Sequence, residues 1–167
     1  ASPLMVSFQD FASLRSEVLN MISSARKRTW LVSTYLTDGE VVSALYMARY
    51  RNLDVKVLLH PSKANAYMSR LSYLRNNRID TFLMPKTFPL QSASALVVDD
   101  SLAVIDGSLD FLAPTRVYQI TYADTAQRDQ FLGAFEQTLS GATVAEAAPV
   151  PNVGKSNTQG RVYLPAP

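Results

Sequence analysis

A chain of 167 residues with 47% hydrophobic content is long enough to bury a core as one domain. It has no cysteine, which excludes disulfides and thiolate metal sites, and its net charge of +2 gives no polybasic surface of the kind that binds nucleic acid. No window holds the roughly 18 uninterrupted apolar residues of a membrane span, so the sequence predicts no transmembrane segment.

The hydrophobic pattern then alternates between helix and strand. Apolar residues at helical spacing from Phe8 to Ala25 predict a first helix, and the β-rich run Thr29 to Leu36 predicts a strand. The next predicted elements are a helix capped by Asp38, strands at 55–60 and 79–84 around a helix at 64–77, a hairpin of 95–98 and 102–105, a strand at 118–122 and a helix at 125–139. This order indicates an α/β fold with a mixed, largely parallel sheet flanked by helices.

The C-terminal part of the chain differs in composition. Residues 142–167 are rich in Pro, Ala, Gly and Asn and lack apolar periodicity, so we expect a domain at 1–141 followed by an extended tail. The run from Gly160 to Pro167, GRVYLPAP, suits addition of a strand to an exposed sheet edge, which makes the tail a candidate docking element. An ordinary terminus with no such role is the alternative.

The most informative stretch is 88–111, FPLQSASALVVDDSLAVIDGSLDF. Its frame resembles the active-site motif of the phospholipase D superfamily, in which a strand carries His-x-Lys, an Asp follows, and a second strand ends in Gly-Ser-x-Asn. In that alignment Ser92 stands at the His position and Ser94 at the Lys position. The other equivalents are Asp99, with Asp100 as an alternative, then Gly107, Ser108 and Asp110.

The resemblance covers roughly Val6 to Gly141 and is most similar to the short, single-motif bacterial nucleases of the superfamily. It implies a phospholipase-D-like layered fold. In that family His attacks phosphorus, a partner His protonates the leaving group, and Lys with Asn binds the phosphate oxygens. Ser92 and Ser94 supply neither an activated nucleophile nor a fixed positive charge, so the resemblance implies a vestigial motif, no catalytic residues and no cofactor.

Four carboxylates accompany this motif. We expect Asp99, Asp100, Asp106 and Asp110 to lie near the vestigial pocket, where they would repel a phosphodiester. The same charges would repel across the symmetric dimer that single-motif relatives form, so we expect that dimer to be weakened or absent. A Mg²⁺ or Ca²⁺ site is an alternative interpretation, although the spacing matches no known metal loop and turn chemistry explains Asp99 and Asp100 more simply.

Two basic groups also have alternative interpretations. His60, the one histidine, ends a predicted strand, where it could act as a replacement base with Lys63 as a phosphate ligand; a strand-end residue before a proline turn is the interpretation we favour. Arg26 to Arg28 could contact phosphate, but cations at a helix C-terminus also complement the helix dipole.

The sequence therefore predicts a catalytically inactive domain that is retained as a structural or interaction component. Its first residues, Ala-Ser-Pro-Leu, suit a mature end left by signal-peptide removal, although an engineered boundary would look the same, and they favour a periplasmic location. The resemblance suggests protein partners in a bacterial envelope assembly, such as a type IV secretion or conjugation complex. The alternatives are a residual phosphodiesterase or nuclease, and a non-catalytic binder of nucleic acid or lipid headgroups.

Overall fold

One mixed sheet forms the centre of the structure, a computed structural model that describes residues 3–85, 93–110 and 116–144. Across the sheet the strands are β1 (Leu4–Phe8), β7 (Tyr118–Tyr122), β6 (Ser101–Ile105), β5 (Ser94–Val98), β2 (Arg28–Ser33), β3 (Asp54–Leu59), β4 (Asp80–Leu83) and β8 (Thr143–Val144). Among the described strands, β2, β3 and β4 pair in parallel, and the other neighbouring pairs are antiparallel. The expected α/β fold with a mixed sheet is confirmed. The expectation that this sheet is largely parallel is wrong, because crossover helices join β2, β3 and β4 as parallel neighbours, whereas β1, β5, β6, β7 and β8 add by antiparallel pairing.

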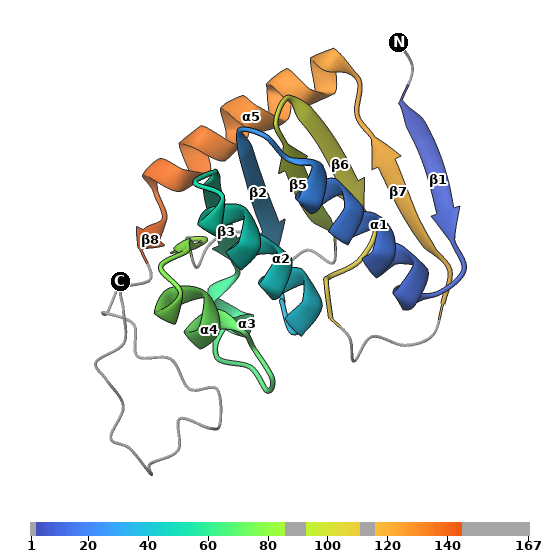
Figure 1. Cartoon of the computed structure of the whole chain (residues 1–167). Helices are drawn as coiled ribbons and strands as arrows, with labels where there is room; N and C mark the ends of the chain where they lie inside the picture. The colour runs from blue at the N-terminus through green and yellow to red at the C-terminus, as the bar shows by residue number, and fades with distance from the viewer. Residues whose placement is uncertain (1–2, 86–92, 111–115, 145–167) are drawn as a thin grey trace.

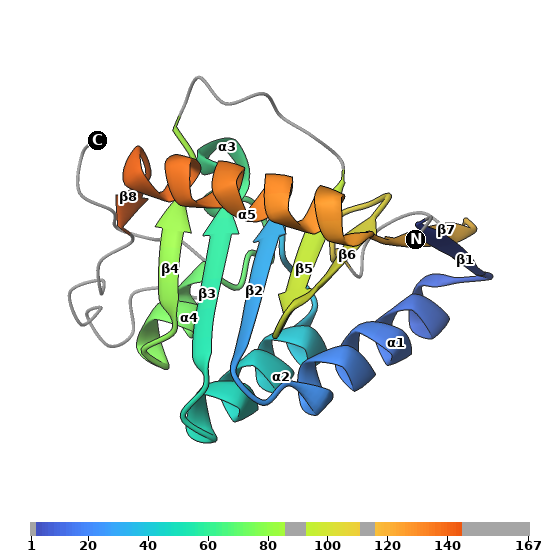
Figure 2. The ribbon, with the colours of Figure 1, turned by 90° about the horizontal axis from the view of Figure 1, so that it is seen from above.

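Helices cover both faces of this sheet (Figure 1). They are α1 (Phe11–Ser24), α2 (Gly39–Tyr50), α3 (Pro61–Ala64), α4 (Leu71–Asn76) and α5 (Thr125–Ser140). Figure 2 shows α1, α2 and α4 on one face and α5 crossing the other. Leu14, Val18 and Leu45 lie in the core of the first face, whereas on the second face the Trp30 ring stacks on Phe135 at 4.9 Å. No helix of the described ranges is long and apolar enough to cross a bilayer.

Local signals place most elements where the sequence predicts them. The Asp38 side chain caps α2 by accepting a hydrogen bond from the Val41 N–H at 3.0 Å. Asp124 and Gln127 form a reciprocal capping box at the start of α5. The predicted β5–β6 hairpin is confirmed, and its turn places Asp99 at a φ of 52°.

The beginning of the chain corrects one prediction. Leu4–Phe8 forms β1, which pairs antiparallel with β7, so Phe8 belongs to a strand and not to the first helix. The helix begins only after Asp10, whose side chain accepts a hydrogen bond from the Ser13 N–H at 2.8 Å. A five-residue strand beside a long helical pattern is too short to be separated from it by periodicity alone.

The helix expected at 64–77 is also different. It divides into α3 and α4, because Met68 has a φ of 67° and the Ser69 hydroxyl donates to the Ala64 carbonyl at 2.6 Å. At the other end of the described chain, Thr143–Val144 forms β8 against β4. Two residues that follow the expected domain boundary therefore belong to the sheet.

Candidate functional site

Four of the motif residues lie together at the end of the sheet where β2, β3 and β6 end and β5 begins. Because β5 runs antiparallel to both β2 and β6, its first residue, Ser94, lies beside the last residue of each, Ser33 and Ile105. The segment Gly107 to Asp110 follows β6 directly. We call Ser94, Gly107, Ser108 and Asp110 the motif edge. Ser92 lies outside the described residues.

Ser94 occupies a closed site at this edge. Its side chain is buried, with 2% of its surface exposed, and its hydroxyl donates to the Gly107 carbonyl at 2.7 Å. The Ser33 hydroxyl lies 3.0 Å from that of Ser94 and donates to the Tyr35 carbonyl at 2.8 Å. Buried polar groups that pair in this way stabilise the fold by about 1 kcal/mol each. Ser94 is thus a short side chain whose hydroxyl is hydrogen-bonded within the chain.

Asp110 is likewise bonded within the chain. Its carboxylate accepts a hydrogen bond from the Thr37 hydroxyl at 2.6 Å. The backbones run together here, since Leu36 and Leu109 form a parallel bridge and the Thr37 N–H donates to the Leu109 carbonyl at 3.2 Å. Burial, and secondarily the Asp110 charge, raises the pKa of the nearby Tyr35 hydroxyl. The Asp110 carboxylate therefore fastens the loop after β6 to the segment after β2.

Arg116 covers the glycine of the motif edge. Its guanidinium donates to the Asp106 carbonyl at 2.9 Å, lies 3.5 Å from the Asp106 carboxylate and stands 4.0 Å from the Tyr118 ring centroid. A Cβ atom at Gly107 would lie 2.4 Å from the Arg116 Nη2, so a larger residue would displace the arginine. Ser108, next to Gly107, is half-buried. The Arg116 guanidinium is thus held beside Gly107 by Asp106 and the Tyr118 ring.

Asp99 lies at the opposite end of the hairpin. Its carboxylate accepts hydrogen bonds from the backbone N–H groups of Arg26, Lys27 and Arg28 at distances of 2.6 to 3.2 Å. The Arg28 side chain also donates to the Asp99 carbonyl at 2.8 Å. Burial works to raise the pKa of Asp99, but these hydrogen bonds outweigh it and lower that pKa. Asp99 clamps the hairpin turn to the connection between α1 and β2.

This geometry shows that the expected cluster of four carboxylates is wrong. The length of β5, about 16 Å, separates Asp99 and Asp100 from Ser94. Only Asp106 and Asp110 lie at the motif edge, and each is bonded as described above. The described residues contain no group of three or more His, Asp or Glu side chains arranged to hold a metal ion. A metal site built on these four residues is therefore excluded by their separation.

His60 follows β3 and reaches the same edge, but its ring caps a helix. The Nδ1 atom accepts a hydrogen bond from the Ser62 N–H at 3.1 Å and lies 2.7 Å from the Ser62 hydroxyl. The side chain is 6% exposed. The Lys63 ammonium lies 5.8 Å from the Tyr35 ring centroid. These contacts favour the strand-end interpretation over the role of a replacement base.

Two residues of this network were missed by sequence reasoning. Ser33 is the last residue of β2 and Thr37 follows it; the Ser33 hydroxyl lies 3.0 Å from the Ser94 hydroxyl, and the Thr37 hydroxyl donates to the Asp110 carboxylate. The signal was available, because polar side chains that follow a buried strand gather at the strand ends where α/β folds place their ligand loops. Without a partner visible in the sequence, however, neither could be assigned a role.

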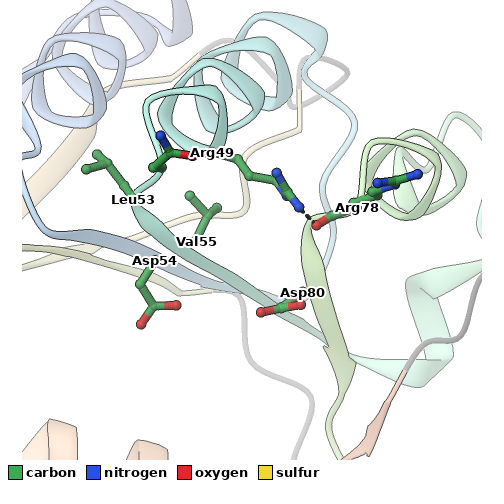
Figure 3. A pocket seen from close by; sticks show the side chains of 7 residues that line it. Arg49, Leu53, Asp54, Val55, Arg78 and Asp80 are labelled. Carbon is green, nitrogen blue, oxygen red and sulfur yellow. Dashed lines mark hydrogen bonds between the residues drawn. The ribbon is translucent and has the colours of Figure 1, made fainter.

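A hollow lies where β3 and β4 begin, at the opposite end of these strands from the motif edge (Figure 3). It has a volume of about 250 Å³ and is lined by side chains from the turns after α2 and α4 and from the first residues of β3 and β4: Arg49, Asn52, Leu53, Asp54, Val55, Arg78 and Asp80. The Arg49 guanidinium donates to the Arg78 carbonyl at 2.6 Å across it. This hollow is separated from Ser94 by the strands and contributes nothing to the motif edge.

Solved structures with the same fold include two bacterial proteins of similar size. Nuc from Salmonella typhimurium, a phospholipase D family member, superposes with a TM-score of 0.73 at 19% identity over 87% of this chain and 99% of its own. NucT from Helicobacter pylori gives 0.67 at 16% identity, over 84% and 98%. The archaeal chromatin protein TrmBL2 gives 0.56 at 15% identity, over 84% and 52%.

Sequence comparison gives the family. A search of curated proteins finds no significant match. The family described as "Cardiolipin synthase, PLD-like domain" matches residues 18–113, which is more than half of the chain and includes the whole motif edge. With the sheet order, the hairpin and the fold similarity in agreement, the chain belongs to this family of phospholipase-D-like domains.

Proposed function

We propose that this chain is a catalytically inactive phospholipase-D-like domain that serves as a structural or interaction component of a bacterial cell-envelope assembly. The first candidate is a type IV secretion or conjugation complex. The proposal has two parts, the loss of phosphodiester chemistry and the retention of the fold for its surfaces. Each part has its own support and its own test.

The closed site at Ser94 carries the first part. Phosphoryl transfer needs a fixed positive charge on the phosphate oxygens, and a serine that is 2% exposed and donates to the Gly107 carbonyl cannot provide one. Ser92, at the nucleophile position, would need a neighbouring base to become reactive. His60, the one histidine of the chain, accepts a hydrogen bond from the Ser62 N–H instead. Ser94 and Asp110 instead hold the loops at the motif edge together by hydrogen bonds within the chain.

Restoration of the motif tests whether the loss is concerted. We expect the double variant Ser92→His, Ser94→Lys to show no strong phosphodiesterase activity, because Asp110 also stands where the family motif has an asparagine that binds the phosphate oxygens. The matched control is Ser101→Lys, on the exposed first residue of β6. Activity within tenfold of an active family nuclease in the double variant would show that the scaffold is still competent.

The second part of the proposal, that the fold is retained for its interaction surfaces, is supported by an intact fold around the buried Ser94. Both hydrophobic cores, the α1, α2 and α4 layer and the Asp99 clamp are complete, so the domain has kept what a rigid scaffold needs. Periplasmic location and a docking role for residues 142–167 are parts of this proposal. A pull-down from native envelopes tests them: the full chain should recover a defined protein complex, and a chain that ends at Val144 should not.

Self-association provides a further test. We propose that the symmetric dimer of single-motif relatives is weakened or absent, although the repulsion now rests on Asp106 and Asp110 alone and their charges are engaged by Arg116 and by a hydrogen bond from Thr37. Light scattering should report a monomer at micromolar concentration. A stable dimer would contradict this part without affecting the catalytic part.

DNA binding is the second candidate, since TrmBL2, an archaeal chromatin protein described as binding DNA, shares the fold. The net charge of +2 argues against it. Binding to duplex DNA that weakens steeply between 50 and 200 mM salt would favour this candidate over the envelope assembly.

A further inference from the structure

The helical layer of α2 and α4 carries an excess of positive charge. The two helices lie side by side (Figure 1). At one end the Arg49 side chain donates to the Arg78 carbonyl at 2.6 Å. At the other end the Arg70 side chain donates to the Thr37 carbonyl at 2.9 Å. Segments 41–53 and 55–79 contain no Asp or Glu, and their seven cations are Arg49, Arg51, Lys56, Lys63, Arg70, Arg75 and Arg78.

Three of these cations have no carboxylate to pair with. Among the described residues, the guanidinium groups of Arg49, Arg51 and Arg78 form no ion pair, and the first two donate to backbone carbonyls. Glu40, at the start of α2, already pairs with Arg15. The C-terminus of α2 favours cations, but its partial charge of about −0.5 does not neutralise three of them. By contrast, six described cations pair with carboxylates: Arg15, Lys27, Arg28, Lys56, Arg116 and Arg128.

The nearest strand carboxylates belong to the other face of the sheet. Val55 packs in the core beneath α2, so strand alternation directs its neighbour Asp54 towards the α5 face. There the Asp54 carboxylate binds the Lys56 ammonium at 2.6 Å. Asp80 is the register partner of Lys56 and shares that face. Figure 3 shows both carboxylates on the strands, apart from the Arg49 guanidinium.

Exposed aromatic and apolar side chains lie among the cations. Tyr50 is 72% exposed, Met47 51% and Tyr73 39%. The Tyr46 ring lies 6.4 Å from the Tyr50 ring, one helical turn away. Tyr, Arg and Met are enriched in protein interfaces, and Tyr and Arg are enriched at the hot spots of binding energy. We call the following residues the α2–α4 face: Tyr46, Met47, Arg49, Tyr50, Tyr73 and Arg78.

We propose that the α2–α4 face binds a protein that presents an acidic surface. Arg49 and Arg78 supply planar donors that match carboxylates, and Tyr50 and Met47 supply contact area beside them. Charge complementarity of this kind selects the partner and speeds association. This inference rests on the proposed function, because it names the surface by which the domain contacts its assembly.

Other occupants fit the α2–α4 face less well. A second copy related by a two-fold axis would bring guanidinium groups against guanidinium groups. Anionic membranes hold proteins through clusters of about four to eight cations, and nucleic acids do so through many phosphate contacts. This face has Arg49 and Arg78, flanked by Arg51, and its remaining residues are aromatic or apolar.

Photo-crosslinking of the full chain in its native envelope tests the proposal. A benzoylphenylalanine photoprobe in place of Met47 should crosslink one protein, through a peptide of net negative charge. Tyr50→Ser combined with Arg78→Asn should reduce this crosslink at least about tenfold, as expected for the loss of two hot spots. This variant should keep its fold, because Tyr50 is exposed and asparagine tolerates the φ of 60° at Arg78.

Two controls accompany this experiment. The same photoprobe at the exposed Ser101 should not crosslink that protein. Lys27→Gln removes an exposed cation outside the α2–α4 face and should change the crosslink yield by less than about twofold.

Three results would overturn the proposal. The first is a Met47 crosslink no stronger than that at Ser101, or one that Tyr50→Ser with Arg78→Asn leaves unchanged. The second is a crosslinked peptide without net negative charge. The third is binding to duplex DNA, or to vesicles of phosphatidylglycerol and phosphatidylethanolamine, that the same double variant weakens about tenfold, because it would assign the face to nucleic acid or membrane. Recovery of a complex in the envelope pull-down without a Met47 crosslink would refute this face alone, whereas loss of both would refute the proposed function as well.

Discussion

The two ends of the β5–β6 hairpin differ in what their polar side chains contact. At the turn, the Asp99 carboxylate accepts hydrogen bonds from three backbone N–H groups. At the motif edge, about 16 Å away, the Ser94 hydroxyl donates to the Gly107 carbonyl and the Asp110 carboxylate accepts a hydrogen bond from the Thr37 hydroxyl. The turn therefore fastens the hairpin to the start of β2, whereas the motif edge fastens loops to one another, and the two ends can be tested separately by substitution.

The largest expected effect comes from the turn. Asp99→Ala removes the acceptor of the Arg26, Lys27 and Arg28 N–H groups and places a Cβ-bearing residue without a polar side chain at a φ of 52°. We expect a loss of about 2–3 kcal/mol in the free energy of unfolding, measured by urea denaturation. Asp100→Ala, at a largely exposed neighbour, should cost less than about 0.5 kcal/mol. Equal losses of unfolding free energy in the two variants would show that the Asp99 hydrogen bonds add no stability beyond that of an ordinary turn residue.

Acid should weaken the same clamp. The pKa of Asp99 is lowered in the folded protein, so its charge stabilises the fold above the unfolded value of about 3.9, and this contribution is lost as the pH falls through the folded pKa. The stability difference between the native chain and Asp99→Asn should therefore shrink as the pH is lowered below about 4. Urea denaturation at pH 6 and pH 3 measures it. A difference that grows in acid would contradict the assigned direction.

The motif edge should respond less. Ser94→Ala leaves the buried Gly107 carbonyl without its donor and should cost about 1–2 kcal/mol. A double-mutant cycle with Ser33→Ala should give a coupling of about 0.5–1 kcal/mol, because the two hydroxyls lie 3.0 Å apart. Ser101→Ala, at an exposed position of β6, is the control and should be neutral. If Ser94→Ala is neutral as well, the network does not hold the edge together.

The smallest effect is expected from the tail. A chain that ends at Val144 retains both cores and β8, so its Tm should fall by less than about 2 °C. A chain that ends at Gly141 also loses the pairing of β8 with β4 and should melt a further 2–4 °C lower. Unfolding of the first chain would show that residues after Val144 belong to the core.

The sequence predicted most helices and strands correctly, but it did not predict how far apart the motif residues lie in the folded chain. The capping residue Asp38, the hairpin turn and the helix α5 follow from local patterns, and the structure confirms them. β1 and the division at Met68 depend on tertiary pairing and on a left-handed backbone, which no local pattern specifies. The supposed acidic cluster failed for a related reason: residues close in sequence, such as Ser94 and Asp99, lie at opposite ends of an extended strand.

The central claim is that the motif edge performs no phosphodiester chemistry. The most direct measurement is hydrolysis of DNA, RNA and phospholipid by the purified full chain, with and without divalent metal, beside an active family nuclease and a His60→Ala variant. The account predicts no activity above background under any of these conditions. Robust hydrolysis by the native chain that His60→Ala abolishes would contradict it.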